Sequence, residues 1–503
     1  MTTVADTFVL SPAAQAMIDN PRCYIDGRWV QGDGEVIEKL NPTTGQPLGS
    51  FQSGSVVQLD TAVAAARRAF DRGEWRADPH ERSRILYRLV ELIEQNRDIL
   101  REVVVADVGT PVSTANSIQL DGALEFFRWF AEAARRGPDG WYERGMAPDS
   151  TPGWPASAGV IVREPIGLVA AMTSYNFPFN LVAWKFGAAL AAGCTVVLQA
   201  SPRATLSTVA LWRLIEQLDL PPGVVNFVLG DVEVGQRLSS HPDVDLVSFT
   251  GSVPVGAKIM GQAAPGIKKV VLELGGKSPN ILLPGTDVEA AMAPSITRLV
   301  SNAGQRCGAT SRILVHESQY DEFCSAAKSF YDNIHVGDPR DESTLVGPVI
   351  DARHRDFIQG HLDRATAAGA QVVARARIAP GLDDGFFLEP VLLGGLSNDA
   401  EFCQEEQFGP VGAVVTYREV DEAVQIANNT KFGLNANVFG PTGDALAVAR
   451  RIRSGTVTVN GGGRIRAEAP WGGFGQSGVG RESGDEGFRE FFQAKHIQWK
   501  LDG

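Results

Sequence analysis

From residue 160 onwards the chain alternates between short apolar runs rich in β-branched residues and helix-like segments. One such series occupies residues 160–273, and a second runs from residue 280 to residue 460. This alternation predicts βαβ units, because neighbouring parallel strands need a crossover connection that is usually a helix. We therefore expect an α/β fold with two parallel-sheet domains and a boundary near Glu273.

The segments outside these two series have a different character. Residues 79–106 carry apolar side chains at three- and four-residue steps, which predicts an amphipathic helix. Residues 137–159 are rich in glycine and proline and predict a loop or projecting arm. A glycine-rich tail, residues 471–503, ends the chain.

Composition excludes several classes of protein. The 503 residues are 44% hydrophobic and 21% charged, as in globular proteins with large cores. A net charge of -13 argues against a nucleic-acid partner, since phosphate binding needs clustered lysine and arginine. The 5 cysteines form no CxxC pair, which favours a reducing compartment. With neither a secretory signal nor an apolar run of about 18 residues, we expect a cytoplasmic protein without a membrane segment.

Two motif matches lack their required context. Gly276-Lys277-Ser278 resembles the end of a P-loop, but Val271 occupies the position of the first glycine. Residues 473–478 satisfy GxGxxG, yet they follow no β-branched strand, so a flexible turn is the expected structure. The 7 histidines form neither HExxH nor a paired metal spacing, and no GxSxG elbow lies near them. We expect no metal site and no serine hydrolase.

Three remaining residues point to covalent chemistry. Glu273 stands at the carboxyl end of a predicted strand, where ligands bind in open α/β sheets. Cys307 ends the sequence GQRC after a predicted helix, and Asn176 lies in SYNFP between a strand and a helix. Singly, each has a structural explanation, since a lone cysteine is more often a small buried apolar residue than a nucleophile.

Together these motifs resemble the aldehyde dehydrogenase superfamily, and the resemblance covers nearly the whole chain in the family's order. It rests on YIDGRW (24–29), NPTTG (41–45), NFP (176–178), PPGVVN (221–226), FTGS (249–252), ELGGKSP (273–279), GQRC (304–307), EEQFGP (405–410) and PWGGFGQSGVGRESG (470–484). An aldehyde dehydrogenase-like fold with two Rossmann-like domains is implied. Its parts are a dinucleotide-binding domain (1–136 and 160–273), a catalytic domain (274–470), and an oligomerisation arm and tail (137–159 and 471–503). A homodimer or homotetramer is implied as well.

The resemblance also implies roles for the three residues. Cys307 is the nucleophile that adds to a small-molecule aldehyde, because a tetrahedral alkoxide expels hydride readily. Asn176 and the backbone N–H of Cys307 hold the developing oxyanion. Glu273 is the general base, and its presence favours hydrolysis over transfer to coenzyme A. The alternatives are a coenzyme A-acylating enzyme and a catalytically silent relative that serves as a binding or structural protein.

The implied cofactor is NAD, with NADP possible. Lys185 and Glu406 match positions that hold the nicotinamide ribose, with Phe408 nearby. The pyrophosphate would meet a helix that begins at Gly251, Ser252 and Gly256, since helix N-termini suit anions. Gln199 and Gly235 match positions that lie beside the adenosine of the cofactor.

Here the sequence departs from its relatives, which usually read Lys-Pro-Ser/Ala-Glu after the corresponding strand. This chain reads Gln199-Ala200-Ser201-Pro202, followed by Arg203. Pro202 removes the carboxylate that repels a 2′-phosphate, and Arg203 could meet that phosphate. Separately, Arg306, Arg464 and Arg466 raise the hypothesis of an anionic substrate.

Overall fold

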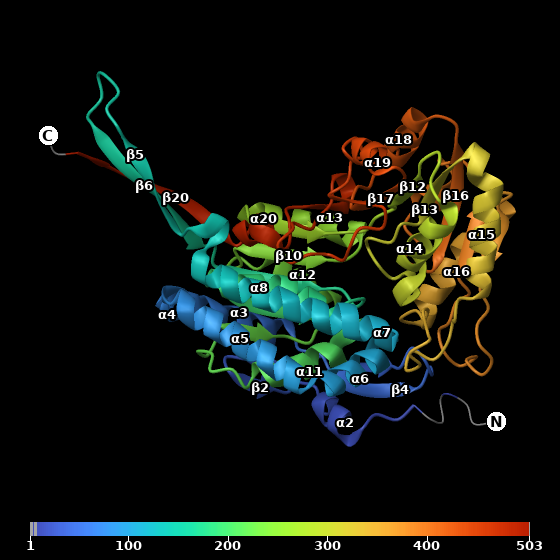
Figure 1. The fold of residues 1–503 in the computed structure, drawn as a ribbon. Coiled ribbons are helices and arrows are strands. Elements are labelled where there is room, and N and C mark those ends of the chain that lie inside the picture. The colour runs from blue at the N-terminus through green and yellow to red at the C-terminus, as the bar shows by residue number, and fades with distance from the viewer. Residues whose placement is uncertain (1–3, 5–7, 502–503) are drawn as a thin grey trace.

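The computed structural model describes residue 4 and residues 8–501. Figure 1 shows two lobes and a thin arm that projects away from them and carries the C-terminus. The buried apolar side chains form two separate clusters, one in each lobe. The α/β class and the two parallel-sheet domains are confirmed. No helix in the described residues is long and apolar enough to cross a membrane.

The first lobe is built on an eight-stranded sheet. In spatial order its strands are β19 (Gly478–Val479), β11 (Lys269–Glu273), β10 (Leu246–Thr250), β7 (Leu168–Thr173), β8 (Thr195–Ala200), β9 (Val225–Phe227), β1 (Cys23–Ile25) and β2 (Arg28–Val30). The five from β11 to β9 are mutually parallel, so their carboxyl ends share one edge. The chain runs outward from β7 in one direction to β9 and in the other to β11, which creates the switch point where α/β sheets bind ligands.

The helices of the first lobe pack on this sheet and on one another. They include α3 (Val56–Arg72), α5 (Pro79–Gln95), α6 (Arg97–Val108), α8 (Ala123–Arg136), α9 (Pro178–Val182), α10 (Ala188–Ala192), α11 (Thr205–Ile215), α12 (Val232–Ser240) and α13 (Val253–Ala263). The single helix predicted for residues 79–106 is wrong in one respect. Asn96 separates α5 from α6, and its side-chain amide caps the carbonyl of Leu92 at 2.9 Å.

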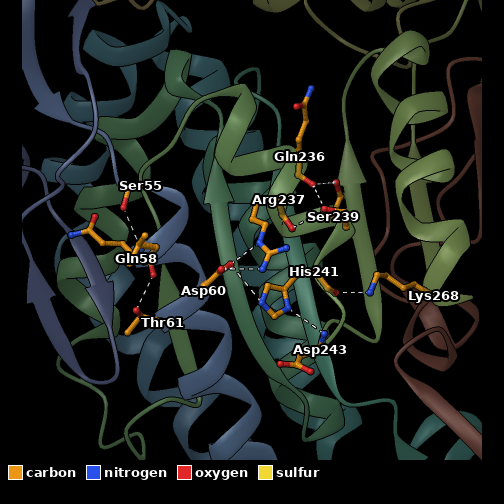
Figure 2. Close-up of polar contacts among 12 residues, drawn as sticks. Ser55, Gln58, Asp60, Thr61, Gln236, Arg237, Ser239, His241, Asp243 and Lys268 are labelled. Atoms are coloured by element: carbon orange, nitrogen blue, oxygen red, sulfur yellow. Dashed lines mark hydrogen bonds and ion pairs between the residues drawn. The ribbon is translucent and has the colours of Figure 1, made fainter.

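A polar cluster fastens α12 to α3, as Figure 2 shows. Arg237 donates two hydrogen bonds to Asp60, at 2.8 and 2.9 Å. His241 Nε2 lies 3.6 Å from the same carboxylate, and burial together with the Arg237 charge lowers its pKa. A bidentate arginine–carboxylate pair fixes orientation as well as distance, so α12 is held firmly beside the strand edge.

The second lobe has a seven-stranded sheet. In spatial order its strands are β14 (Gln371–Arg375), β15 (Val391–Gly394), β16 (Val411–Tyr417), β13 (Arg312–His316), β12 (Pro279–Leu282), β17 (Asn435–Phe439) and β18 (Thr456–Val459). All neighbours are parallel except β14 and β15. Its helices include α14 (Val288–Val300), α15 (Tyr320–Asp332), α16 (Ala352–Ala367), α18 (Val420–Asn428) and α19 (Thr442–Ala449).

The arm is a three-stranded antiparallel sheet in the order β20 (Phe492–Lys500), β6 (Ser157–Pro165) and β5 (Glu143–Asp149). This corrects two predicted boundaries. Residues 160–165 continue β6 and belong to the arm, because their hydrogen-bond partners lie in β20 and β5 rather than in the parallel sheet.

The tail divides in the same way. Only β20 joins the arm, whereas residues 471–491 pack against the first lobe and also contact Gly433 of the second. In the first lobe β19 pairs with β11 next to Glu273, and a side chain at Gly478 would come within 2.0 Å of the Leu272 carbonyl. The predicted flexible turn is therefore an ordered element: Ser477 Oγ accepts from Gly433 N–H and donates to the Gly275 carbonyl, at 3.0 and 2.7 Å.

Candidate active site

The loop that carries Cys307 leaves α14 in an unusual backbone conformation. Asn302 and Ala303 have φ of 54° and 53°, in the left-handed region that costs non-glycine residues about 1–3 kcal/mol each. Gly304 follows with φ 67°, and a Cβ there would lie 2.0 Å from the Gly409 carbonyl. The Gln305 side chain braces the loop by accepting from Ile350 N–H at 3.0 Å. Such strain persists only where the surroundings enforce it, and it clusters at active sites.

The three residues predicted for chemistry meet at one cavity of about 350 Å³. Cys307, Glu273 and Asn176 line it together with apolar side chains that include Phe126, Phe177, Leu181, Trp184 and Trp471. Asn176 follows β7 and Glu273 ends β11, and the carboxyl ends of both strands lie at the same edge of the first sheet. Cys307 comes from the second lobe. The cavity therefore forms where the switch point of the first sheet faces the strained loop.

The Cys307 thiol is held protonated in this arrangement. Burial, together with the nearby carboxylates of Glu273 and Glu406, raises its pKa to about 12. The charge of Arg306 and the Gly308 backbone N–H act in the opposite direction. A neutral thiol is a weak nucleophile, so this site requires a base to take the proton when an aldehyde is attacked.

Glu273 occupies a buried niche beside that thiol. It is 2% exposed, and its carboxylate oxygens have no close hydrogen-bond partner in the described part of the chain, although the nearby Trp471 ring N–H acts to lower its pKa. Gly472 leaves the space it needs, since a Cβ there would lie 2.9 Å from Glu273 Oε1. Burial raises the pKa of Glu273 well above its usual value, and the charge of Glu482 adds to that effect while Lys185 opposes it. A carboxyl group in such a niche is suited to general acid–base work near neutral pH.

Lys185 has buried partners that the sequence did not predict. Its ammonium group is completely buried and donates to Glu482 Oε1 at 2.5 Å and to Ser248 Oγ at 3.1 Å. These two bonds hold the ammonium group behind Glu273 and leave its third N–H, so the contact with a cofactor ribose stays a prediction. Lys185 forms a buried ion pair that tunes the pKa of Glu273.

Asn176 is fixed by its backbone as well as by its side chain. Its carbonyl accepts from Gln119 Nε2 at 3.2 Å and from Asn302 Nδ2 at 3.3 Å. The side-chain amide donates to the Gln305 carbonyl at 3.0 Å and lines the cavity. One amide N–H is thereby engaged, and the second remains for an oxygen bound beside Cys307.

A helix N-terminus lies at the same strand edge. Helix α13 begins after Ser252, with no side-chain cap and no acidic residue in its first turn. Ser252 and most of that first turn are exposed, while Gly256 packs against Leu274. Gly251 joins the helix to β10 and donates to the Glu273 carbonyl at 3.0 Å. N–H groups at a helix start suit a pyrophosphate, so the exposed start of α13 at Ser252 fits the predicted cofactor. The N–H groups of Gly251 and Gly256 are already used within the fold, on the carbonyls of Glu273 and Ser252, so these glycines contribute space rather than donors.

Glu406 and Phe408 lie at the second lobe's face of this region. Glu406 Oε1 accepts from Gly276 N–H at 3.0 Å, and a Cβ at Gly275 would collide with its other oxygen. Burial raises the pKa of Glu406 to about 7. Phe408 packs edge-on against Tyr175 with ring centroids 6.0 Å apart.

The residues expected beside the adenosine of the cofactor have partners within the protein. Gln199 donates to the Asp231 carbonyl at 2.8 Å, and Gly235 makes room for its other amide atom. Arg203 forms an ion pair with Asp351 at 3.0 Å and lies 5.5 Å from the Tyr175 ring. Its charge is thus already compensated, which argues against the idea that it receives a 2′-phosphate.

Several residues of the site were missed by sequence reasoning. Glu482 lies in the glycine-rich sequence PWGGFGQSGVGRESG (470–484). It is the only acidic residue there, and this was the only sign in the sequence of a role at the site. Arg298 sits near the end of α14 without any motif, yet it lines the cavity. Within the described residues, no group of three or more histidine, cysteine or acidic side chains is arranged to hold a metal.

Comparison with known proteins agrees with this geometry. The chain matches the aldehyde dehydrogenase family over residues 29–497. A Staphylococcus saprophyticus protein with the provisional name of an aldehyde dehydrogenase is 38% identical over 480 residues, which is 94% of this chain and 98% of the relative. The chain therefore belongs to the aldehyde dehydrogenase family, whose members oxidise aldehydes.

Solved structures give the same result for the fold. A betaine aldehyde dehydrogenase from Staphylococcus aureus in complex with NAD+ is 35% identical, with a TM-score of 0.92 and 97% coverage of both chains. A Burkholderia cenocepacia protein, provisionally named an aldehyde dehydrogenase, is 33% identical, with a TM-score of 0.91 and coverage of 96% of this chain and 98% of its own. The predicted aldehyde dehydrogenase-like fold is confirmed.

Proposed function

We propose that the protein oxidises an aldehyde to the free carboxylic acid through a thioester on Cys307, with NAD(P) as hydride acceptor. The observation that carries this proposal is the cavity lined together by a thiol, a buried carboxyl group and a side-chain amide. The direct test is to incubate the protein with aldehydes and NAD+ without coenzyme A. Formation of reduced cofactor and free acid supports the proposal, and the absence of both across a broad aldehyde panel would refute it.

The chain's own groups suit each step. Glu273 takes the thiol proton as Cys307 Sγ bonds to the carbonyl carbon, and the resulting alkoxide is held by the Asn176 amide and the Cys307 N–H. When bound, a nicotinamide supplies the acceptor for the hydride that leaves this carbon. Glu273 releases that proton to solvent and then takes a proton from a water, whose oxygen bonds to the thioester carbon and displaces the thiolate of Cys307. A coenzyme A-acylating enzyme would not need this carboxyl group to activate water, so its presence favours hydrolysis.

Cofactor use is supported by the fit of α13, Glu406 and the switch point, and by the NAD+ bound in the solved betaine aldehyde dehydrogenase. Gln199 and Gly235 lie beside α12 on the adenosine side of the same strand edge. A silent binding protein would not need a thiol and a buried carboxyl group in one cavity, which disfavours that alternative.

Replacing Asn176 with alanine should lower kcat by about 10²–10³-fold, because one oxyanion donor is lost. Steady-state kinetics on a single aldehyde would measure this. Asn333→Ala is a control on the exposed end of α15 and should retain the wild-type rate. A similar kcat for Asn176→Ala and wild type would remove Asn176 from the oxyanion site.

Discrimination between NAD and NADP should be weak, with NAD the better cofactor by less than about a thousandfold, or some 4 kcal/mol. Pro202 brings no charge, and Arg203 is paired with Asp351. Pro202→Glu should therefore lower kcat/KM for NADP about tenfold or more relative to NAD, by like-charge repulsion. Arg203→Gln should change both cofactors alike. Selective loss of NADP activity in Arg203→Gln would show that this arginine does bind the 2′-phosphate.

We also propose that the arm pairs protomers into a homodimer or homotetramer. Every residue of β5 is exposed, and β5 and β20 leave the two edges of the arm sheet free. Exposed Trp154 and Trp499 add apolar surface to this arm. Open strand edges with apolar side chains favour pairing with another chain.

A further inference from the structure

Some of the charged side chains that line the Cys307 cavity form ion pairs and others do not. Among the described residues they are two acids and four arginines: Glu125, Glu273, Arg298, Arg306, Arg464 and Arg466. A cavity that excludes water strengthens every charge interaction inside it, so the balance of these groups constrains what can bind.

Two of the arginines are already neutralised. Arg464 Nη1 lies 2.7 Å from Glu125 Oε2, and Arg466 Nε donates to Glu468 Oε1 at 2.6 Å. Both arginines were candidates for an anion site from the sequence, and their ion pairs argue against that role. Glu273 does not compensate the remaining cations, because burial favours its protonated, uncharged form.

Arg298 and Arg306 have only neutral partners. Arg306 donates to Ser301 Oγ at 2.7 Å, whereas Arg298 donates to Thr458 Oγ1 at 3.1 Å and to the Gly463 carbonyl at 3.4 Å. Neither forms an ion pair with a carboxylate anywhere in the described residues. Burial, together with the neighbouring Arg298 charge, lowers the pKa of Arg306 to about 10.

This arrangement is costly without an anion. Both guanidinium groups stay charged at neutral pH, lie near each other and are half-buried. Each guanidinium group still has N–H groups that are free to donate. Two guanidinium groups side by side match the two oxygens of a carboxylate.

We propose that the substrate is an aldehyde that carries a carboxylate, an ω-oxo acid whose anionic end is bound by Arg298 and Arg306. The inference rests on the proposed function and specifies its substrate class. The walls of the same cavity include Phe177, Leu181 and Trp471, which suit a short hydrocarbon chain joining the two ends of this substrate. Arg306 adjoins the nucleophile, which favours a short chain.

The same charges disfavour a cationic aldehyde. The solved betaine aldehyde dehydrogenase to which this chain is similar is named for a quaternary ammonium substrate. Trp184 and Phe126 could attract such a cation through their ring faces. Two uncompensated guanidinium groups would repel it, and that repulsion outweighs a ring contact of about 2 kcal/mol in a desolvated site.

The test compares kcat/KM for oxo acids of three to five carbons, for neutral aldehydes of the same lengths, and for betaine aldehyde, all with NAD+. We expect the best oxo acid to exceed its neutral counterpart at least about tenfold. In Arg298→Gln, the ratio of oxo acid to neutral aldehyde should fall about 10- to 100-fold. Arg298→Lys, which keeps the charge, should restore part of it. Arg466→Gln removes an already neutralised arginine and should leave the ratio unchanged.

A second measurement does not depend on turnover. Succinate should slow alkylation of Cys307 by iodoacetamide in the wild type and not in Arg298→Gln. Preference for a neutral aldehyde or for betaine aldehyde, or an unchanged ratio in Arg298→Gln, would overturn the inference while leaving the proposed function intact. Failure to oxidise any aldehyde would instead refute the proposed function.

Discussion

Replacing Cys307 with serine should lower dehydrogenase activity by at least about a thousandfold, because a hydroxyl is a far weaker nucleophile than a thiol whose proton a base can take. Cofactor binding should be largely preserved, since Cys307 lies in the second lobe and α13 in the first. Steady-state rates and a cofactor titration by intrinsic fluorescence measure the two effects separately.

Cys324 provides the matched control for this substitution. It lies on α15, outside the residues that line the cavity, and its thiol hydrogen-bonds with Tyr320. Cys324→Ser should keep the wild-type rate. If Cys307→Ser retained more than a few per cent of the rate, Cys307 would not be the nucleophile.

Replacing Glu273 with glutamine should slow turnover by about 10²–10⁴-fold, the usual contribution of a general base. The step that suffers most is hydrolysis, so a rapid burst of one reduced cofactor per active site should precede a very slow steady rate. Stopped-flow absorbance at 340 nm resolves these two phases.

The pH profile gives a second readout of the same residue. Because burial raises the pKa of Glu273, its carboxylate form is lost as pH falls through a range above that of an ordinary glutamate. Wild-type kcat should therefore decline on the acid side, and this limb should be missing in Glu273→Gln. Glu405→Gln, at an exposed ion pair with Lys431, is the control and should keep the wild-type profile. Wild-type turnover in Glu273→Gln would show that another group is the base.

Much of the fold follows from local sequence patterns. The β-branched runs that form β7, β8, β10 and β11 are buried on both faces, so each shows a nearly continuous apolar signal. The arm boundary was harder to predict, because residues 160–165 look like any other β-branched strand. Their partner, β20, lies more than 300 residues along the chain, and nothing local specifies it.

The site was predictable to the extent that its residues stand in motifs. Glu273, Cys307 and Asn176 meet in one cavity as expected. The partner of Lys185 was not predictable, since Glu482 is 297 residues away and only the ordered tail brings it into contact. Arg298 was missed because an arginine in the last turn of a helix has an ordinary explanation, interaction with the helix dipole.

The central claim is that oxidation passes through an acyl group on Cys307, and mass spectrometry tests it most directly. Wild-type protein and Glu273→Gln are mixed with an aldehyde and NAD+, quenched in acid within the burst, and digested. The account predicts a thioester-linked acyl group on the peptide that contains Cys307, close to one per site in Glu273→Gln and less in the wild type. Reduced cofactor released in the burst with no acyl group on Cys307, or with the acyl group on another cysteine, would contradict it.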